Sequence, residues 1–264
     1  MTDWLSLVRG DAPLIVSIPH AGTIIADDIT GLLSHSRARR DADHHVDRLY
    51  AFAADMGATI VHSGMSRTVV DLNRDPSGQS LYPGQATTGL CPTTTFDGEP
   101  LYGAGSEPAA DEVERRLAAY FNPYHAVLGE QIKRLRARHP AIVVYDAHSI
   151  RSHVPRLFEG QLPQYNIGSF DGASCDPALT EAIAAQCAGS SHVVNGRFKG
   201  GWITRHYGRP SDGVHAVQME LAMRGYVDEQ GPWPPPWEAA RAAPMQARLR
   251  SILATCLDFA KEPR

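Results

Sequence analysis

Two short segments rich in β-branched and apolar residues constrain the fold of this 264-residue chain more than any other feature. Residues 13–18 read PLIVSI and residues 141–146 read AIVVYD, with almost no polar interruption before their ends. Strands of this composition are typical of parallel sheets that are covered by helices on both faces. Segments 58–62, 67–72 and 214–221 have a similar composition, and we expect them to be strands as well.

The segments between these strands carry the periodicity of amphipathic helices. Apolar residues at helical spacing predict helices over residues 46–56 and 113–135, and a last helix over roughly 237–262. Alternating strands and helices predict an α/β protein, a three-layer α/β/α sandwich with a mixed, largely parallel sheet. A chain of this length commonly forms one such unit, so we expect a single domain spanning residues 1–264.

The composition is that of a folded protein, and its overall charge indicates no particular partner. Apolar residues make up 43% of the chain and charged residues 20%, which is enough for a large core. The net charge of −4 lacks the basic excess of proteins that bind nucleic acids or anionic membranes. The N-terminal segment has neither a basic region nor an unbroken apolar stretch, so we expect a cytoplasmic protein without a signal peptide or membrane span. No pattern indicates an oligomeric state.

Two histidines stand at the ends of two predicted strands. His20 follows the first buried strand in SIPHAG, and His148 follows the second in YDAHS. In an open α/β sheet, ligands bind outside the carboxyl ends of the strands, where the loops diverge. One histidine in such a turn usually satisfies a backbone group, but two at equivalent positions favour a shared site.

Metal binding by these histidines would require a carboxylate as well. A catalytic zinc site typically has three protein ligands from His, Asp or Glu, and a fourth position open to water. Segment 41–47, DADHHVD, supplies Asp43 and Asp47 where a helix is expected to begin. The ordinary role of Asp43 there is a helix N-cap, and that of Asp47 is a solvated helix position. The pattern leaves both as candidate ligands.

Glu220 interrupts the apolar strand predicted over 214–221. An unpaired carboxylate is costly to bury, so this residue either faces solvent at a sheet edge or stands in a cleft with a raised pKa. The second arrangement would suit a general base that acts on water.

Arg67 and Arg74 stand at opposite ends of the strand predicted over residues 67–72, Arg67 at its start and Arg74 just after its end. Arginine forks bind carboxylates through two parallel hydrogen bonds. Arg74, with Asn73 beside it, is therefore a candidate for binding an anionic substrate, and Arg67 is a candidate cation near the same site.

Long segments without periodicity follow the predicted strands. Residues 73–108 and 147–175 are expected to be loops, and loops of this length in a compact domain are usually functional. Segment 196–208 combines four glycines with several cations, which is typical of a surface hairpin or of a lid over an anion. Its basic residues are Arg197, Lys199, Arg205 and His206.

Taken together, these motifs resemble the N-formylglutamate amidohydrolase family, also called N-formylglutamate deformylase. The resemblance covers about residues 13–230 and implies a fold similar to that of zinc carboxypeptidases and aspartoacylases. It implies hydrolysis of N-formyl-L-glutamate to L-glutamate and formate in bacterial histidine degradation. The motifs, in chain order, are SIPHAG, HVDRLY, SRTVVDLNR, LYPGQATTGLCP, YDAHSIRS, PRLFEG, NGRFKGGWITRHYG and GVHAVQMEL.

The resemblance also implies roles for individual residues. One divalent ion, with Zn²⁺ as the expected metal, would be held by His20, His148 and an acidic residue, for which Asp43 is the expected match and Asp47 the alternative. Glu220 falls where relatives carry a catalytic Glu. His44 stands where we expect an aromatic residue in the DxDWHVD form of the family, a departure that bears on the acidic ligand.

The dicarboxylate implied as substrate calls for several cations. Asn73 and Arg74 match the Asn-Arg pair that binds the substrate carboxylate in the related enzymes. We expect Arg67 or Arg205 to share the developing oxyanion with the metal. The second carboxylate is expected to meet a further cation, for which the candidates are Arg151, Lys199 and Arg205.

Three other functions are compatible with parts of the pattern. The first is a metal-dependent deacylase of another N-acyl amino acid. The second is a thiol amidase with Cys91 or Cys175 as nucleophile, although the four cysteines form no CxxC pair. The third is a protein that binds acidic metabolites without catalysis.

Overall fold

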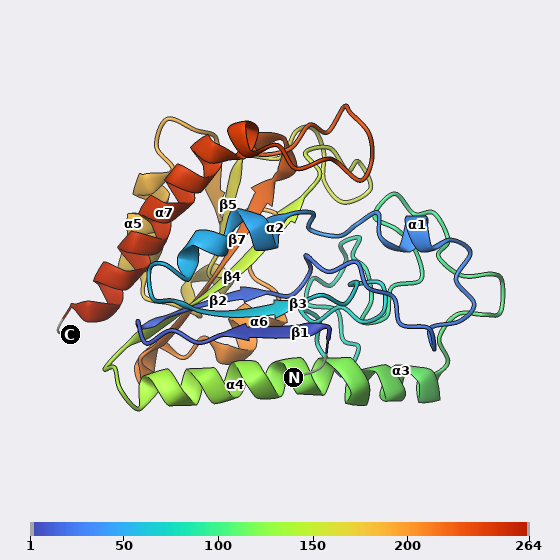
Figure 1. Cartoon of the computed structure of the whole chain (residues 1–264), viewed down its shortest axis with the longest axis horizontal. Helices are drawn as coiled ribbons and strands as arrows, with labels where there is room; N and C mark the ends of the chain where they lie inside the picture. The colour runs from blue at the N-terminus through green and yellow to red at the C-terminus, as the bar shows by residue number, and fades with distance from the viewer. Residues whose placement is uncertain (1–2, 263–264) are drawn as a thin grey trace.

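The computed structural model describes residues 3–262, which form one seven-stranded sheet with helices around it (Figure 1). The strands are β1 (Leu5–Val8), β2 (Leu14–Ile18), β3 (Thr59–Ser63), β4 (Ile142–Ile150), β5 (Tyr165–Gly168), β6 (His192–Val194) and β7 (Val214–Ala222). Their order across the sheet is β1-β3-β2-β4-β7-β5-β6. Strands β3, β2, β4 and β7 are parallel, as are β5 and β6, whereas β1 pairs antiparallel with β3 and β5 with β7. The mixed, largely parallel sheet is therefore confirmed.

Helices cover both faces of this sheet, and Figure 1 shows α4 and α7 on opposite sides of it. The helices are α1 (His35–Ala38), α2 (Val46–Leu49), α3 (Ala110–Arg116), α4 (Asn122–Arg136), α5 (Pro177–Gln186), α6 (Trp202–Tyr207) and α7 (Ala239–Lys261). Successive residues of a strand point to opposite faces, so Val16 packs in one core cluster with α7 and Ile15 in the other with α4. The three-layer sandwich predicted from the sequence is confirmed.

The expectation of a strand over residues 67–72 is wrong. This segment is a series of turns, in which Val69 and Val70 are buried in the core cluster beneath α4. The guanidinium of Arg116 in α3 donates to the carbonyl of Val69 at 3.0 Å, so the backbone here bonds to a helix rather than to a neighbouring strand. β-branched residues suit buried positions, and a turn can bury them as well as a strand can.

Other expected boundaries also shift. The helix expected over 46–56 ends at Leu49 and continues only as a short 3₁₀ turn, Ala51–Ala53. The helix expected over 113–135 has three consecutive parts, with a π-helical turn, Leu117–Phe121, between α3 and α4. Part of the expected loop 147–175 is regular, because β4 extends to Ile150 and β5 lies within it.

The carboxyl ends of the parallel strands meet at one edge of the sheet, beneath the loops that follow them. The segment 73–108 forms turns and isolated bridges and lies over this edge. Figure 1 shows these loops gathered at the end of the molecule away from the C-terminus. Among residues 3–262, no helix is both long and apolar enough to cross a membrane.

Candidate metal centre and active site

Three side chains that are distant in sequence meet at the carboxyl edge of the sheet. His20 follows β2, His148 lies in β4, and Asp43 lies just before α2. The backbone N–H of Asp43 donates to the carbonyl of His20 at 2.9 Å, which ties the two loops together. All three side chains are almost fully buried, and one potential ligand atom from each lies within 4.8 Å of the others. This His–Asp–His group has the donor set of a divalent metal site.

The atoms that face the centre of the group are Nδ1 of both imidazoles and Oδ2 of Asp43. Oδ2 lies 3.1 Å from Nδ1 of His148 and 3.8 Å from Nδ1 of His20. Nδ1 of His20 is buried and, among the described residues, has no hydrogen-bond partner. A buried acceptor without a partner is costly, and a metal ion at this point would satisfy it. The residues present therefore fit a bound metal.

Two further carboxylates hold the outer nitrogens of the imidazoles. Nε2 of His20 lies 2.8 Å from Oδ1 of Asp71, and Nε2 of His148 lies 2.8 Å from Oδ2 of Asp146. A proton on each Nε2 leaves Nδ1 free to bind a cation, and outer carboxylates of this kind are characteristic of metal-binding histidines. Burial lowers the pKa of His148, but Asp146 and Asp43 outweigh it and raise that pKa well above its ordinary value.

Asp43 does not act as the helix N-cap that its position suggests. The N-cap of α2 is His45, in a left-handed conformation with φ of 65°, and makes no side-chain cap bond. Asp43 instead accepts hydrogen bonds from the backbone N–H of Ser149 at 3.1 Å and from Arg67 at 3.3 Å. The carboxylate is therefore oriented toward the histidines by β4 and by a buried cation.

Glu220 stands beside this group on the neighbouring strand. It lies in β7 directly opposite His148 of β4, and only 7% of its surface is exposed. Burial raises its pKa to about 8, an effect that Asp43 reinforces and that His148 and Arg67 oppose. Nε2 of Gln218 donates to Oε2 of Glu220 at 3.3 Å. A carboxylate with this pKa can both take and return a proton near neutral pH.

Arg67 links the inner and outer carboxylates. Its guanidinium donates to Asp43 at 3.3 Å and to Asp71 at 2.7 Å, and it lies 4.8 Å from the ring centroid of Phe96. Burial lowers the pKa of Arg67, but Asp71 and Asp43 outweigh it and raise that pKa, so the side chain stays charged. The arginine therefore presents a fixed positive charge at the wall of the site.

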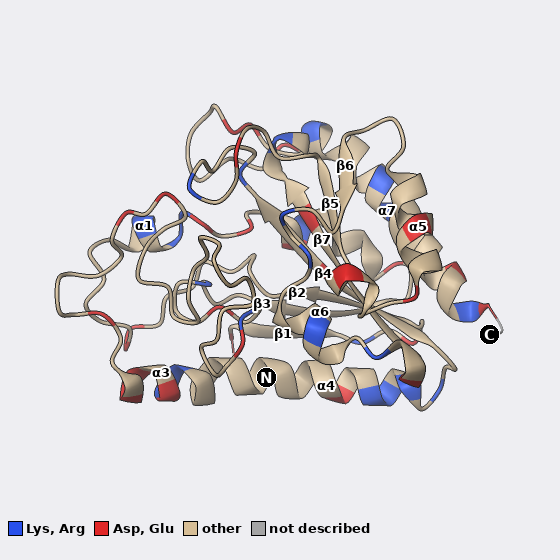
Figure 2. Ribbon diagram, turned by 180° about the vertical axis from the view of Figure 1, so that it is seen from behind, with Lys and Arg blue, Asp and Glu red and all other residues tan. Residues whose placement is uncertain are grey.

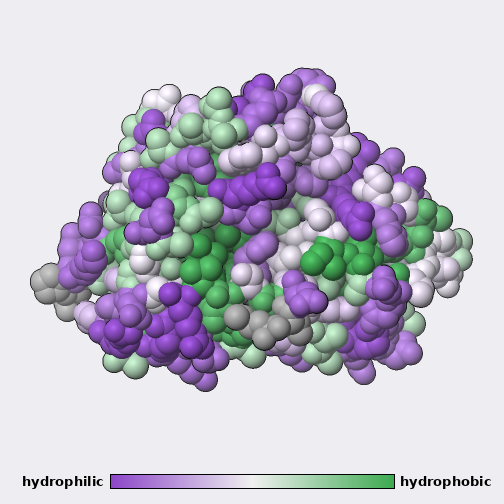
Figure 3. Space-filling model, viewed as in Figure 1, coloured by the Kyte–Doolittle hydropathy of each residue, from purple (hydrophilic) through white to green (hydrophobic). Residues whose placement is uncertain are grey.

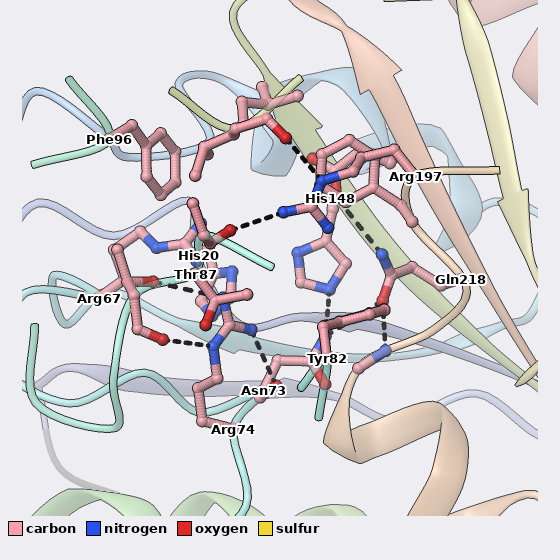
Figure 4. Close-up of a pocket in the computed structure, with 17 residues that line it drawn as sticks. His20, Arg67, Asn73, Arg74, Tyr82, Thr87, Phe96, His148, Arg197 and Gln218 are labelled. Carbon is pink, nitrogen blue, oxygen red and sulfur yellow. Dashed lines mark hydrogen bonds between the residues drawn. The ribbon is translucent and has the colours of Figure 1, made fainter. Parts of the chain in front are cut away.

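A cavity opens above the two histidines and Glu220 (Figure 4). Of the residues singled out from the sequence, its lining includes His20, Arg67, Asn73, Arg74, His148 and Glu220. Figure 4 shows Arg67 and Arg74 on one side of this cavity and Arg197 on the other. Figure 2 shows basic and acidic residues interspersed along the ribbon of the loops near α1 and α3.

Asn73 faces the cavity, but its amide group is bonded within the protein. Its nitrogen donates to Asp146 at 2.8 Å, and its oxygen accepts from the backbone N–H of Ile203 at 2.7 Å. This amide therefore ties β4 to α6 and supports the outer carboxylate of His148.

Arg74 lines the cavity as well and is one-fifth exposed. Its Nε donates to the carbonyl of Thr88 at 3.0 Å, and its Nη2 lies 3.9 Å from Asp71. These contacts orient the guanidinium and leave N–H groups of its fork for an anion in the cavity.

Three of the expected cations do not line this cavity. Arg151 forms ion pairs with Asp97 at 2.8 Å and Asp41 at 3.5 Å, and Lys199 pairs with Asp171 at 3.0 Å at the surface. The Nε of Arg205 donates to the carbonyl of Gly200, and its guanidinium lies over the rings of Tyr82 and Phe170. Arg205 therefore stabilises the loop around Gly200 and Tyr82 and does not line the cavity.

Asp47 and His44 lie on a separate groove, next to Trp233. The imidazole of His44 is packed edge to face against Trp233 with a centroid separation of 5.2 Å. Asp47 lines this groove rather than the cavity above His20 and His148. The structure therefore places Asp43, and not Asp47, beside the two histidines.

The two cysteines considered as nucleophiles are not at the site. Neither Cys91 nor Cys175 lines the cavity. Burial raises the pKa of the Cys91 thiol to about 11, and burial also raises the pKa of Cys175, which contacts the hydroxyl of Thr180. Both thiols are thus held in the protonated, unreactive form at neutral pH.

Four residues of the site were not identified from the sequence. Asp146 lies two positions before His148, and the strand period of two, which puts both on one face, was a usable signal. Asp71 had no such signal, because it lies in the segment wrongly expected to be a strand. Gln218 shares the face of Glu220 in β7, and Arg197 was one of several cations in a loop.

Comparison with known proteins provides independent evidence on the family of this chain. The family model for N-formylglutamate amidohydrolase matches residues 12–227. N-formylglutamate deformylase from Pseudomonas aeruginosa is 48% identical over 266 residues, which cover 99% of this chain and 99% of that protein. The protein of the same name from Pseudomonas putida is 46% identical, covering 98% of this chain and 97% of that protein.

A solved structure shares the same architecture. The crystal structure of N-formylglutamate amidohydrolase from Ralstonia eutropha JMP134 aligns with a TM-score of 0.80 at 24% identity, covering 98% of each chain. At this level of identity the likeness establishes a common fold, in agreement with the sheet described above.

Proposed function

The chain belongs to the N-formylglutamate amidohydrolase family, and we propose that it hydrolyses N-formyl-L-glutamate to L-glutamate and formate in a metal-dependent reaction. The observation that carries this proposal is the buried group of His20, Asp43 and His148, which lies beside Glu220 at the floor of a cavity lined by arginines. A neutral pocket would not favour a dicarboxylate, whereas this cavity supplies fixed positive charge.

His20, Asp43 and His148 would hold one divalent ion, for which Zn²⁺ fits the two imidazoles and one carboxylate. Such an ion supplies Lewis-acid chemistry, which polarises a carbonyl oxygen and makes water more acidic. Asp71 and Asp146 fix the imidazoles with Nδ1 toward this point.

Glu220 is the proposed general base. It takes a proton from the water that attacks the formyl carbon and returns that proton to the glutamate nitrogen as the C–N bond breaks. One water is consumed, and one formate and one glutamate leave, so the protein ends in its starting state. Its pKa near 8 suits both transfers.

Arg67 is proposed to stabilise the oxyanion that develops on the formyl oxygen. Its guanidinium is already held by Asp43 and Asp71, so it needs little reorganisation as charge appears. Arg74 is proposed to bind the α-carboxylate, because its contact with Asp71 places it on the same side of the cavity as Arg67. Asn73, the neighbour of Arg74, is proposed to position His148 through its hydrogen bond to Asp146.

We further propose that residues 1–264 act as one catalytic domain, since both core clusters pack on one sheet. The reaction belongs, in this proposal, to histidine degradation in the cytoplasm.

A formate-release assay combined with metal analysis tests the proposal. The purified protein is expected to contain about one divalent ion per chain and to release formate from N-formyl-L-glutamate faster than from N-formyl-L-aspartate or N-acetyl-L-glutamate. A better rate with N-acetyl-L-glutamate would instead favour a deacylase of another N-acyl amino acid. Ligand binding without formate release would favour a non-catalytic protein.

A further inference from the structure

The three arginines that line the cavity differ in their acidic partners. Arg67 is paired with Asp43 and Asp71, and Arg74 lies 3.9 Å from Asp71. Within residues 3–262, no carboxylate oxygen lies within 4.0 Å of Arg197, so its charge is not neutralised by a direct ion pair. A half-buried cation without a counter-ion is unfavourable unless something else supplies the negative charge.

The structure holds the guanidinium of Arg197 in one place. Its Nε donates to the carbonyl of Leu157 at 2.7 Å, and its Nη2 donates to the carbonyl of Ala86 at 2.7 Å. Its Cζ lies over two aromatic rings, 5.6 Å from the centroid of Tyr82 and 5.5 Å from that of Phe198. Arg197 is thus oriented in advance, which lowers the entropic cost of binding an anion.

Some N–H donors of the Arg197 guanidinium have no partner within the protein among residues 3–262. A guanidinium has five N–H donors, and the two carbonyls accept one from Nε and one from Nη2. Nη1 donates to no group among the described residues. Arg197 lines the same cavity as His148 and Glu220, so a molecule bound there would meet this side chain.

The electrostatic surroundings agree with this geometry. Burial lowers the pKa of Arg197, the positive charge of Arg74 lowers it further, and Tyr82 and Glu220 act in the opposite direction. An anion placed between Arg74 and Arg197 would relieve the repulsion between them. Figure 4 shows the two arginines on opposite sides of the cavity, with His148 between them in that view.

We propose that Arg197 is the specificity-determining residue that binds the side-chain carboxylate of the substrate. This inference rests on the proposed function. The α-carboxylate is attached to the carbon that carries the formyl nitrogen, so it must lie near the reacting group, on the side of Arg67 and Arg74. The side-chain carboxylate is separated from that carbon by two methylenes, so it reaches across the cavity to Arg197.

The contacts of Arg197 admit one competing role, in which it only ties the loop around Ala86 to Leu157. The two roles differ in what they predict for a substrate that lacks the distal charge. Loss of a loop tie would slow all substrates alike. Loss of a carboxylate partner would slow only those that carry the carboxylate.

The test compares N-formyl-L-glutamate with N-formyl-L-glutamine, which has nearly the same shape but a neutral side chain. In wild type, kcat/KM is expected to favour N-formyl-L-glutamate by at least ~100-fold, because a neutral side chain would leave the half-buried cation of Arg197 unpaired. Arg197→Met is expected to reduce this preference by about 100-fold, chiefly through KM for N-formyl-L-glutamate. Arg197→Lys is expected to restore part of it, since it keeps the charge and loses the planar fork.

Tyr82→Phe is the matched control. The hydroxyl of Tyr82 donates to the carbonyl of Gly200 at 2.8 Å, so this variant removes another tie of the same loop without changing any charge. It is expected to change kcat/KM for both substrates by the same factor. Arg197→Gln, which keeps a polar N–H donor but removes the charge, gives the same comparison as Arg197→Met if the methionine variant folds poorly.

The outcomes separate the inference from the function on which it rests. If Arg197→Met and Arg197→Gln keep the wild-type preference, or lower kcat/KM equally for both substrates, Arg197 does not bind the distal carboxylate. If wild type releases no formate from N-formyl-L-glutamate, the proposed function itself is wrong. An active wild type with an unaltered preference in the variants therefore overturns the assignment of Arg197 alone.

Discussion

His148 and Glu220 lie directly opposite each other on adjacent parallel strands, in register in the pairing of β4 with β7. One residue is a candidate metal ligand and the other a candidate general base, and the hydrogen-bond ladder of the sheet fixes their separation. A site that is built on paired strands is more precisely held than one on loops. This relationship keeps a base and a metal ligand matched independently of the loops above them.

Glu220→Gln is expected to lower kcat by roughly 10²–10⁴-fold, because the amide cannot accept a proton. The metal content should stay at the wild-type level, since Glu220 is not one of the three proposed ligands. Formate release and metal analysis on the same preparation check both statements. Glu181→Gln, at an exposed position on α5, is the control and should retain wild-type kcat. Full activity in Glu220→Gln would remove this residue from the reaction.

Asp43→Asn is expected to reduce metal content and activity together, and Asp47→Asn to leave both close to wild type. The two residues are one helical turn apart in sequence, but only Asp43 lies beside the histidines, while Asp47 lines a separate groove. A chelator should likewise lower the Tm of wild type, because loss of a ligand that binds only the folded state is destabilising. Loss of metal in Asp47→Asn but not in Asp43→Asn would reverse the assignment.

The main sheet and its two histidines could be predicted from the sequence because buried parallel strands leave a strong local signal. His20 follows LIVSI, and His148 stands at the end of the strand that begins IVVYD. Because the two strands are parallel, their carboxyl ends lie at the same edge of the sheet. The short edge strands gave no such signal. Val193 in β6 is flanked by exposed residues, so neither burial nor alternation marks that strand.

The outer part of the site was harder to predict, because it depends on contacts distant in sequence. The role of Asp71 was not predicted, because the composition of Val69 and Val70 is typical of a strand. In the structure, these two residues lie in turns and pack beneath α4. Arg197 could not be distinguished from Arg205 by composition. The backbone turns at Gly200, with φ of 115°, between the two residues, and Arg197 rather than Arg205 lines the cavity.

Asp71→Asn is expected to weaken metal binding by about 10–100-fold, although Asp71 is not itself a proposed ligand. Its carboxylate fixes Nε2 of His20 at 2.8 Å and also pairs with Arg67 at 2.7 Å, so the amide disturbs both groups. Titration of the metal-free protein with Zn²⁺ measures the effect. Asp75→Asn, on the neighbouring loop, is the control, because within residues 3–262 its carboxylate accepts hydrogen bonds from Ser77 alone. An unchanged Zn²⁺ affinity in Asp71→Asn would show that His20 is oriented by other contacts.

Cys91→Ser and Cys175→Ser are expected to retain activity within about twofold. Neither thiol lines the cavity; Cys91 is partly buried and Cys175 is buried, and this burial raises both pKa values, so neither supplies a thiolate at neutral pH. The same assay run with a chelator distinguishes the two chemistries. Formate release that survives chelation but is lost with either cysteine would establish a thiol mechanism in place of the proposed one.

The stability of the metal-free protein should depend on pH through Glu220. Burial raises the pKa of this carboxyl from 4.5 to about 8 in the folded protein, so between these values the folded state keeps a proton that the unfolded state releases. The contribution of the protonated carboxyl to the free energy of unfolding is therefore fully present below pH 4.5 and is lost as the pH rises toward 8. The amide of Glu220→Gln does not titrate, so the free energy of unfolding of this variant does not fall for this reason.

The free energy of unfolding of Glu220→Gln, relative to wild type, should thus increase by roughly 2–5 kcal/mol between pH 4.5 and pH 8 and stay constant above it. Urea unfolding in the presence of a chelator, at several pH values, measures this difference directly. Titrating groups remote from Glu220 are present in both proteins and cancel in the comparison, whereas His148 and Asp43 interact with Glu220 and contribute to the measured difference. Parallel stability curves for the two proteins over this range would mean that the carboxyl of Glu220 is hydrated, and a hydrated carboxylate would be a weaker base than the reaction requires.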